Sequence, residues 1–121
     1  MRVKKIKIGI KDLKTALKDF AEKADAIERG KKVKKETGVY FTSFEAFRKI
    51  LTPKRLELLH VIRVKKPSSI NELARMAKRD VKNVAEDVKY LEQIGLIEKK
   101  ETNNKTAPVT RYDRIDLEIA V

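Results

Sequence analysis

The sequence predicts an α+β fold built around a helix-turn-helix and a β-hairpin. Ser69 and Glu72 stand three residues apart as a capping box, which marks the start of a helix. A second amphipathic helix is expected over residues 80–94, with Asp80 as its cap, and Gly95 ends it as a residue suited to a left-handed conformation. Apolar and polar residues then alternate, which predicts two strands and a turn over residues 97–112. This order of elements is that of a winged helix-turn-helix.

The outward face of the helix over residues 80–94 is the expected reader of DNA, because a major groove about 12 Å wide admits one helix. Asn83 is suited to adenine, Lys82 to guanine or a phosphate, and Glu86 to the amino group of cytosine. The turn and the hairpin are expected to contact phosphates. The full set of expected DNA contacts is Ser69, Lys78, Arg79, Lys82, Asn83, Glu86 and Lys89 in the helix-turn-helix, with Lys99, Lys100, Lys105 and Arg111 in the wing.

Residues 1–40 are predicted to form a basic strand-helix extension of a winged-helix domain over residues 41–121. A weak alternation favours a short strand over residues 3–8. Apolar residues then recur at spacings of three and four, the pattern of a helical seam. They are Ile10, Leu13, Leu17, Phe20, Ala24 and Ile27. This helix either packs on its own domain or pairs with a second copy, and the second alternative predicts a homodimer.

The remaining elements follow from capping signals and alternation. Residues 39–41 are expected to form a strand, and Thr42 with Glu45 a capping box that starts a short helix. Threonine and proline at residues 52–53 start another helix, since proline at the first helical position gives up no needed N–H group. The alternation over residues 115–121 predicts a half-buried strand with an acidic outer face.

The charge of the chain favours a polyanionic partner. Thirty Lys and Arg residues stand against 18 Asp and Glu residues, for a formal net charge of +12. Residues 1–40 hold 13 basic and 6 acidic residues, a net of +7, whereas residues 41–121 hold 17 and 12, a net of +5. Much of the positive charge therefore lies outside the predicted DNA reader, and an acidic protein is a second candidate partner.

Composition argues against several classes of function. The chain has no Cys and one His, and it shows neither a phosphate-cradling glycine-rich loop nor a metal-ligand spacing. We therefore expect no catalytic residues, no metal and no cofactor. No apolar run is long enough to cross a membrane, and the amino terminus lacks the apolar stretch of a signal peptide. A cytoplasmic protein without a membrane partner is expected.

Two parts of the sequence resemble known protein families. Residues 68–102 resemble the winged helix-turn-helix of MarR- and ArsR-type regulators, which share the pattern Leu-Glu-x-x-Gly-Leu-Ile over residues 91–97. Residues 41–121 resemble a family of small archaeal winged-helix transcriptional regulators. The shared pieces are Leu51 to Leu59, Arg79-Asp80-Val81-x-Asn83-Val84 and Tyr112-Asp113-x-Ile115. Related helices often carry a basic residue where this chain has Glu86.

The resemblance implies dimeric binding to operator DNA. Genes of such small regulators also neighbour toxin-like genes, which would make the protein an antitoxin that represses its own operon. The sequence thus predicts a sequence-specific regulator of double-stranded DNA, with repression as the expected mode. Two alternatives stay open. One is an antitoxin whose residues 1–40 neutralise an acidic protein, and the other is a nonspecific architectural DNA binder.

Overall fold

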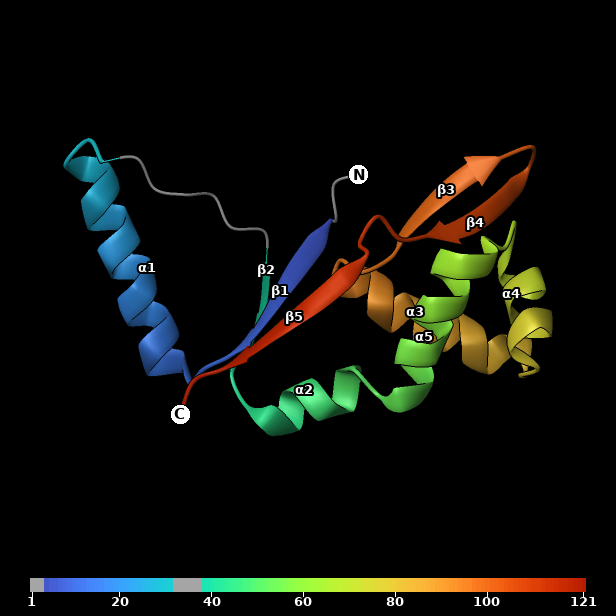
Figure 1. The fold of residues 1–121 in the computed structure, drawn as a ribbon, viewed down its shortest axis with the longest axis horizontal. Helices are drawn as coiled ribbons and strands as arrows, with labels where there is room; N and C mark the ends of the chain where they lie inside the picture. The colour runs from blue at the N-terminus through green and yellow to red at the C-terminus, as the bar shows by residue number, and fades with distance from the viewer. Residues whose placement is uncertain (1–3, 32–37) are drawn as a thin grey trace.

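A three-stranded sheet lies between helix α1 at one end of the molecule and a helical unit with a β-hairpin at the other (Figure 1). The structure is a computed structural model that describes residues 4–31 and 38–121. Its elements in chain order are β1 (Lys5–Ile10), α1 (Leu13–Glu28), β2 (Gly38–Phe41), α2 (Phe44–Ile50), α3 (Pro53–Lys65), α4 (Ile70–Ala77), α5 (Val81–Gln93), β3 (Glu98–Thr102), β4 (Lys105–Val109) and β5 (Arg114–Ile119). The predicted helix, turn, helix and hairpin are all present.

The sheet has the order β2-β1-β5, and both pairings of the central strand are parallel. Ile8 of β1 lies opposite Val39 of β2 and Leu117 of β5. Because side chains alternate across a strand, the isoleucines of β1 share one face, and all three are buried. The strand expected over residues 3–8 is thus confirmed from residue 5 onward, while residue 3 lies outside the described residues. The strand extends to Ile10 and occupies the centre of a sheet that the sequence did not predict. This sheet combines β1, from residues 1–40, with β5, from residues 41–121. The division of the chain into an extension and a winged-helix domain at residue 40 stays a prediction.

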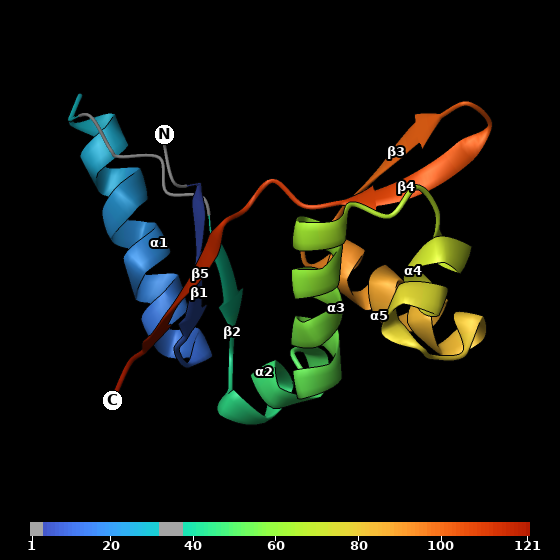
Figure 2. The same cartoon turned by 45° about the vertical axis from the view of Figure 1, so that its right-hand side comes forward.

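Helix α1 begins later than the sequence predicts. Ile10 pairs with Phe41 and Ile119 in the sheet, so its expected place in the helix is wrong. Asp12 caps the helix instead, and its carboxylate accepts a hydrogen bond of 2.7 Å from the backbone N–H of Thr15. Figure 2 shows α1 standing beside the sheet, at the opposite end of the molecule from α4 and α5.

One hydrophobic core joins the sheet to the helical unit. Ile6 and Ile8 of β1 belong to the same buried cluster as Leu51, Leu58 and the apolar residues of α4 and α5. Asp113, which precedes β5, strengthens the join: its carboxylate accepts from the backbone N–H of Lys4 at 2.8 Å and pairs with Arg63 of α3. The sheet is therefore packed against the helical unit on its apolar face.

Most helices begin at the capping residue that the sequence predicts. Thr52 caps α3, with Pro53 at its first position as predicted. The capping box expected at Thr42 is wrong, because Ser43 is the N-cap of α2 and its hydroxyl accepts from the backbone N–H of Ala46 at 3.1 Å. Serine and threonine stand side by side here, and both are good caps, so spacing alone does not separate them.

Replacement of Gly95 by alanine is expected to lower the free energy of unfolding by about 1 kcal/mol. Gly95 has a φ of +84°, a conformation that side-chain-bearing residues rarely adopt, and a Cβ built there meets no atom within 4 Å. The cost is therefore backbone strain rather than collision. Urea unfolding of Gly95→Ala and Gly95→Asn measures it, and asparagine should cost less than alanine because it tolerates left-handed backbone.

Candidate nucleic-acid interface

Helices α4 and α5 are joined by a short turn whose backbone and caps define their crossing. Ser69 caps α4, and its hydroxyl accepts from the backbone N–H of Glu72 at 3.1 Å. The Glu72 carboxylate accepts from the backbone N–H and the hydroxyl of Ser68, and these hydrogen bonds hold the pKa of Glu72 below its ordinary value. Lys78 ends α4 in a left-handed conformation, and Asp80 caps α5. The predicted turn and both caps are confirmed.

Helix α5 has a buried apolar face and an exposed polar face. Val84, Val88 and Leu91 are buried against the core at spacings of four and three. Lys82 and Glu86 are exposed on the other side, together with Lys89 and the neighbouring Asn83. At 3.6 residues per turn, positions 82, 86 and 89 fall on one face. The structure thus brings four of the expected DNA contacts together on one helix surface.

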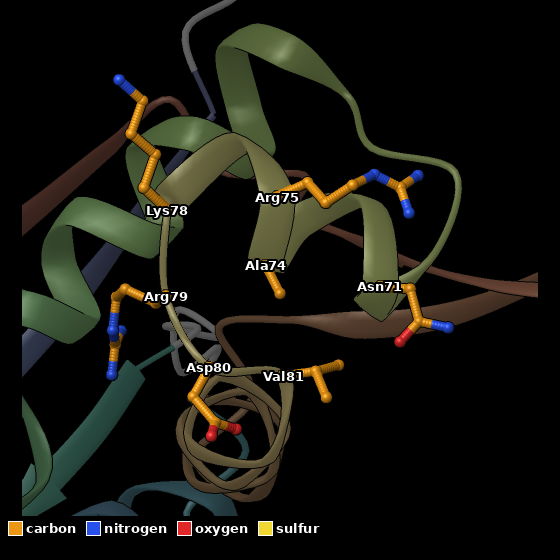
Figure 3. Close-up of a pocket in the computed structure, with 7 residues that line it drawn as sticks. All are labelled: Asn71, Ala74, Arg75, Lys78, Arg79, Asp80 and Val81. Atoms are coloured by element: carbon orange, nitrogen blue, oxygen red, sulfur yellow. The ribbon is translucent and has the colours of Figure 1, made fainter.

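A groove of about 530 Å³ lies where α4 meets the start of α5 (Figure 3). Seven residues line it, and they are Asn71, Ala74, Arg75, Lys78, Arg79, Asp80 and Val81. Arg75 and Asn71 extend from α4 to one side, whereas Arg79 turns to the other side (Figure 3). The exposed cations that line this groove are Arg75 and Lys78, and the start of α5 contributes Asp80 and Val81 to it. Asn71 and Arg75 were missed by sequence reasoning, although they are four residues apart and therefore share one face of α4.

Arg79 is held inside the fold by Asp87. Its guanidinium donates to the Asp87 carboxylate at 2.7 Å, and Arg55 of α3 donates to the other oxygen at 2.9 Å. Burial alone raises the pKa of Asp87, but the hydrogen bonds and charges of the two arginines outweigh it and hold this pKa below its ordinary value. Arg55 also stacks over the ring of Tyr90 at 4.1 Å and donates to the carbonyl oxygens at residues 49–50. This network, which we name the Asp87 cluster (Arg55, Arg79, Asp87 and Tyr90), ties α5 to α3 and to the turn.

The hairpin β3–β4 forms the predicted wing. Asn103 and Asn104 make its tip in left-handed backbone, the conformation of a two-residue hairpin turn. Lys100 and Lys105 are exposed and share one side of the hairpin, because Thr102 pairs with Lys105 and side chains alternate along a strand. Pro108 lies in β4, which pairs only with β3 in the described residues. The wing therefore presents two unburied lysines towards its tip.

Besides Arg79, three of the expected contacts have partners among the described residues. Lys99 pairs with Glu92 at 3.6 Å, Arg111 with Glu98 at 2.6 Å, and the Ser69 hydroxyl is engaged as a cap. These pairs are exposed, so their exchange for a phosphate costs little. The structure separates the expected contacts into a face on α4 and α5, a wing, and the inward-turned Arg79.

Comparison with protein families identifies one match. The profile of the HVO_A0114 family matches residues 50–117, which span the end of α2 through most of β5. The chain belongs to this family. The matched region contains the helix-turn-helix, the wing and the edge strand β5, and it leaves β1, α1 and β2 outside.

A solved structure resembles the fold over a longer region. The crystal structure of the predicted DNA-binding transcriptional regulator from E. coli superposes with a TM-score of 0.50 at 18% sequence identity, and the match covers 82% of this chain and 84% of that one. Residues 41–121 make up about two thirds of this chain, so the likeness includes part of residues 1–40. At this identity the match describes the fold. No curated protein matches the chain.

Within residues 4–31 and 38–121, no group of three or more His, Cys, Asp or Glu side chains is placed to hold a metal ion. No helix in these ranges has both the length and the apolar character needed to cross a membrane.

Proposed function

We propose that this chain is a transcriptional regulator that binds double-stranded DNA in a sequence-specific manner, with α5 in the major groove and the β3–β4 wing against the backbone or minor groove. The observation that carries the proposal is the exposed polar face of α5, on a helix whose first residue lines a groove together with Arg75 and Lys78. A helix of this kind fits the major groove, and cations at its edge reach the flanking phosphates. The net charge of +12 adds a favourable field for DNA.

The roles of individual residues follow from their places. Asn83 and Lys82, in the first turn of α5, are the proposed base contacts, because the start of a recognition helix lies closest to the base edges. Glu86 lies one turn further along, where a carboxylate is tolerated next to DNA only if it accepts from cytosine. Lys100 and Lys105 are proposed to bind phosphates from the wing. Arg79 acts indirectly, since it holds the turn through Asp87.

Repression by a dimer is the proposed mode. A second copy doubles the contacted DNA and matches a pseudo-palindromic operator. The exposed apolar side chains of α1 favour a protein contact at the end of the molecule far from α5 (Figure 1). The same observation keeps an antitoxin role as the second candidate, in which α1 binds a different protein. An architectural DNA binder is the third, and it differs from the first in showing no sequence preference.

The proposed groove contacts predict two different responses to mutation. After selection of bound sequences from random duplexes, Asn83→Ala is expected to lose about 1–3 kcal/mol on the selected site and almost nothing on random DNA. Lys100→Ala should weaken both by a similar factor and reduce the slope of log affinity against log salt by about 0.9. Fluorescence anisotropy over a salt series measures both effects. Lys18→Ala is the matched control, because the side chain of Lys18 is exposed on α1. This variant should keep the affinity for DNA within twofold of the wild type, a difference of at most about 0.4 kcal/mol in binding free energy.

Equal affinity of the wild-type protein for the selected and the random duplexes would contradict sequence-specific binding. That outcome, with a steep salt dependence, would assign the protein to the architectural class. Absence of measurable affinity for any duplex at low salt would reject DNA binding altogether.

A further inference from the structure

Helix α1 carries an apolar stripe that no part of the described chain covers. Leu13, Leu17, Phe20 and Ile27 are between 59% and 72% exposed, and α1 has no buried residue. Ala24 completes the stripe at the same helical spacing. A contiguous apolar face on a surface helix marks an interaction site, because its burial is favourable and its exposure promotes association.

The sheet does not provide the cover, since the side of α1 that faces it is polar. Lys11 donates to Asp19 at 2.5 Å, and its ammonium lies 4.3 Å from the centre of the Tyr40 ring. A groove of about 330 Å³ between α1 and the sheet is lined largely by charged residues, including Glu22 and Lys23. The positions of Asp19 and Lys23 lie roughly a quarter turn from the stripe at 3.6 residues per turn. The stripe therefore points away from the rest of the chain.

The charges of α1 argue against an acidic occupant. The helix contains three lysines and four acidic residues, for a net charge of −1. The basic surplus of residues 1–40 thus lies outside α1, and an acidic protein would meet a weakly repulsive surface on this helix. A partner with a matching mixture of charges fits better.

The order of these charges argues for an antiparallel partner of the same sequence. Lys14 lies in the first turn of α1, at the positive end of the helix dipole, and Glu28 lies at the negative end. Each is misplaced in an isolated helix. Asp25 is already compensated by Arg29 at 3.3 Å. An antiparallel copy would bring its own Glu28 beside Lys14 and so relieve both ends.

We propose that α1 pairs antiparallel with α1 of a second copy, with Phe20 of each copy packed over Ala24 of the other. In this register Leu17 faces Ile27 of the second copy, so four apolar layers form and the largest side chain meets the smallest. Lys14 lies beside Glu28 of the second copy on one flank, and this contact occurs twice because the interface is two-fold symmetric. Lys23 approaches its own symmetry mate on the other flank, where exposure to water screens the repulsion.

The surrounding fold makes so short a seam sufficient. A helix of 16 residues is about 24 Å long, which is short for an independent coiled coil. Here α1 follows the central strand β1 after two residues, so much of its orientation is fixed before pairing. The inference rests on the proposed function in that it names the partner through which the regulator becomes a dimer, but it is tested without DNA.

The first test is the molecular mass of the protein over a range of concentrations, measured by sedimentation in the absence of DNA. The wild-type protein should be a dimer, and Phe20→Glu should weaken self-association by about a hundredfold or more, as loss of a central aromatic contact does. Phe20 is exposed in a single copy, so this variant should keep the helix content of the wild type. Lys18→Glu, outside the stripe, is the matched control and should remain a dimer.

Two further measurements determine the register. The chain contains no Cys, so a mixture of Leu17→Cys and Ile27→Cys copies should give the mixed disulfide, whereas Leu17→Cys alone should give little. The two Leu17 residues of an antiparallel pair stand about 15 Å apart along the axis, beyond the reach of a disulfide. Lys14→Glu and Glu28→Lys should each weaken the dimer, and the double variant should restore it.

Three results would overturn the pairing. A wild-type protein that is monomeric at every concentration would reject the pairing of α1. A dimer that Phe20→Glu leaves intact would reject it as well, because that dimer would use another surface. Efficient disulfide formation by Leu17→Cys alone would show a parallel pair. A wild-type monomer that still binds its selected DNA would leave the proposed function standing without this partner. Conversely, a dimer without DNA affinity would retain the pairing and reject the function.

Discussion

Replacing Asp87 by alanine is expected to lower the free energy of unfolding by about 3–5 kcal/mol, because it leaves two mostly buried arginines without their counter-ion. The side chain of Asp87 is 13% exposed and that of Arg55 12%. For a chain of this size the melting temperature should fall by roughly 10–20 °C, as circular dichroism or calorimetry would record. The adjacent Glu86→Ala is the control, since that side chain is exposed and its loss should change stability by less than about 0.5 kcal/mol.

The same carboxylate predicts how stability depends on pH. The pKa of Asp87 is lowered in the folded protein from an ordinary value of 3.8, so the unfolded chain binds its proton at higher pH than the folded one. The stabilisation by Asp87 is therefore complete above this ordinary value and is lost as the pH falls through the lower folded value. The difference in stability between the wild type and Asp87→Asn should accordingly be constant near neutral pH and shrink below about pH 4. A pH-independent difference would contradict the role of the ionised carboxylate in the Asp87 cluster.

Replacement of Ile8 by alanine is expected to cost about 2–5 kcal/mol of unfolding free energy. Ile8 is fully buried in the central strand of the sheet and belongs to the same core cluster as Leu58 and Leu91. Truncation removes apolar contacts and leaves a cavity between the sheet and the helical unit. The loss should appear in the one unfolding transition of the whole chain, followed by probes of both helix content and tyrosine fluorescence.

The control for this second prediction is Val64→Ala in α3, whose side chain is 61% exposed and should contribute little. Two separate transitions, with only one of them moved by Ile8→Ala, would indicate that residues 1–40 fold independently of residues 41–121. A single transition would instead show that the sheet and the helical unit stabilise one another.

The helical unit and the wing were predictable because their signals are local. Ser69 with Glu72, Asp80 and Gly95 each act within one turn of helix, so a stretch of sequence is enough to place them. The turn at residues 103–104 follows from the alternation on both sides. The exposed surface of α5 was predictable for the same reason. Val84 and Val88 mark the buried face of the helix, and the exposed residues are those on its opposite face.

The sheet and the Asp87 cluster were not predictable because their contacts join distant parts of the chain. Lys5 pairs with Arg114 and Arg55 with Asp87, and nothing in either local sequence marks the partner. The inward turn of Arg79 depends on the same contact, so a turn residue expected at the DNA surface faces the interior. Ile10 fits both a strand and a helical seam by spacing, and only the parallel partners on either side of β1 decide between them.

The place of β1 at the centre of the sheet also sets the order in which the protein can be assembled during synthesis. Its register partner on β5 lies 109 residues later in the chain, so the ribosome needs about 5–20 s to deliver it after β1 has appeared. Throughout that interval the edge of β1 that later pairs with β5 stays open, on a strand rich in isoleucine, even after β2 has been made. The lysines at positions 4, 5, 7 and 11, which interrupt and flank these isoleucines, are the kind of charged residue that discourages strand aggregation. Part of the positive charge at this end of the chain is thus suited to protecting a late-completed strand, independently of any bound partner.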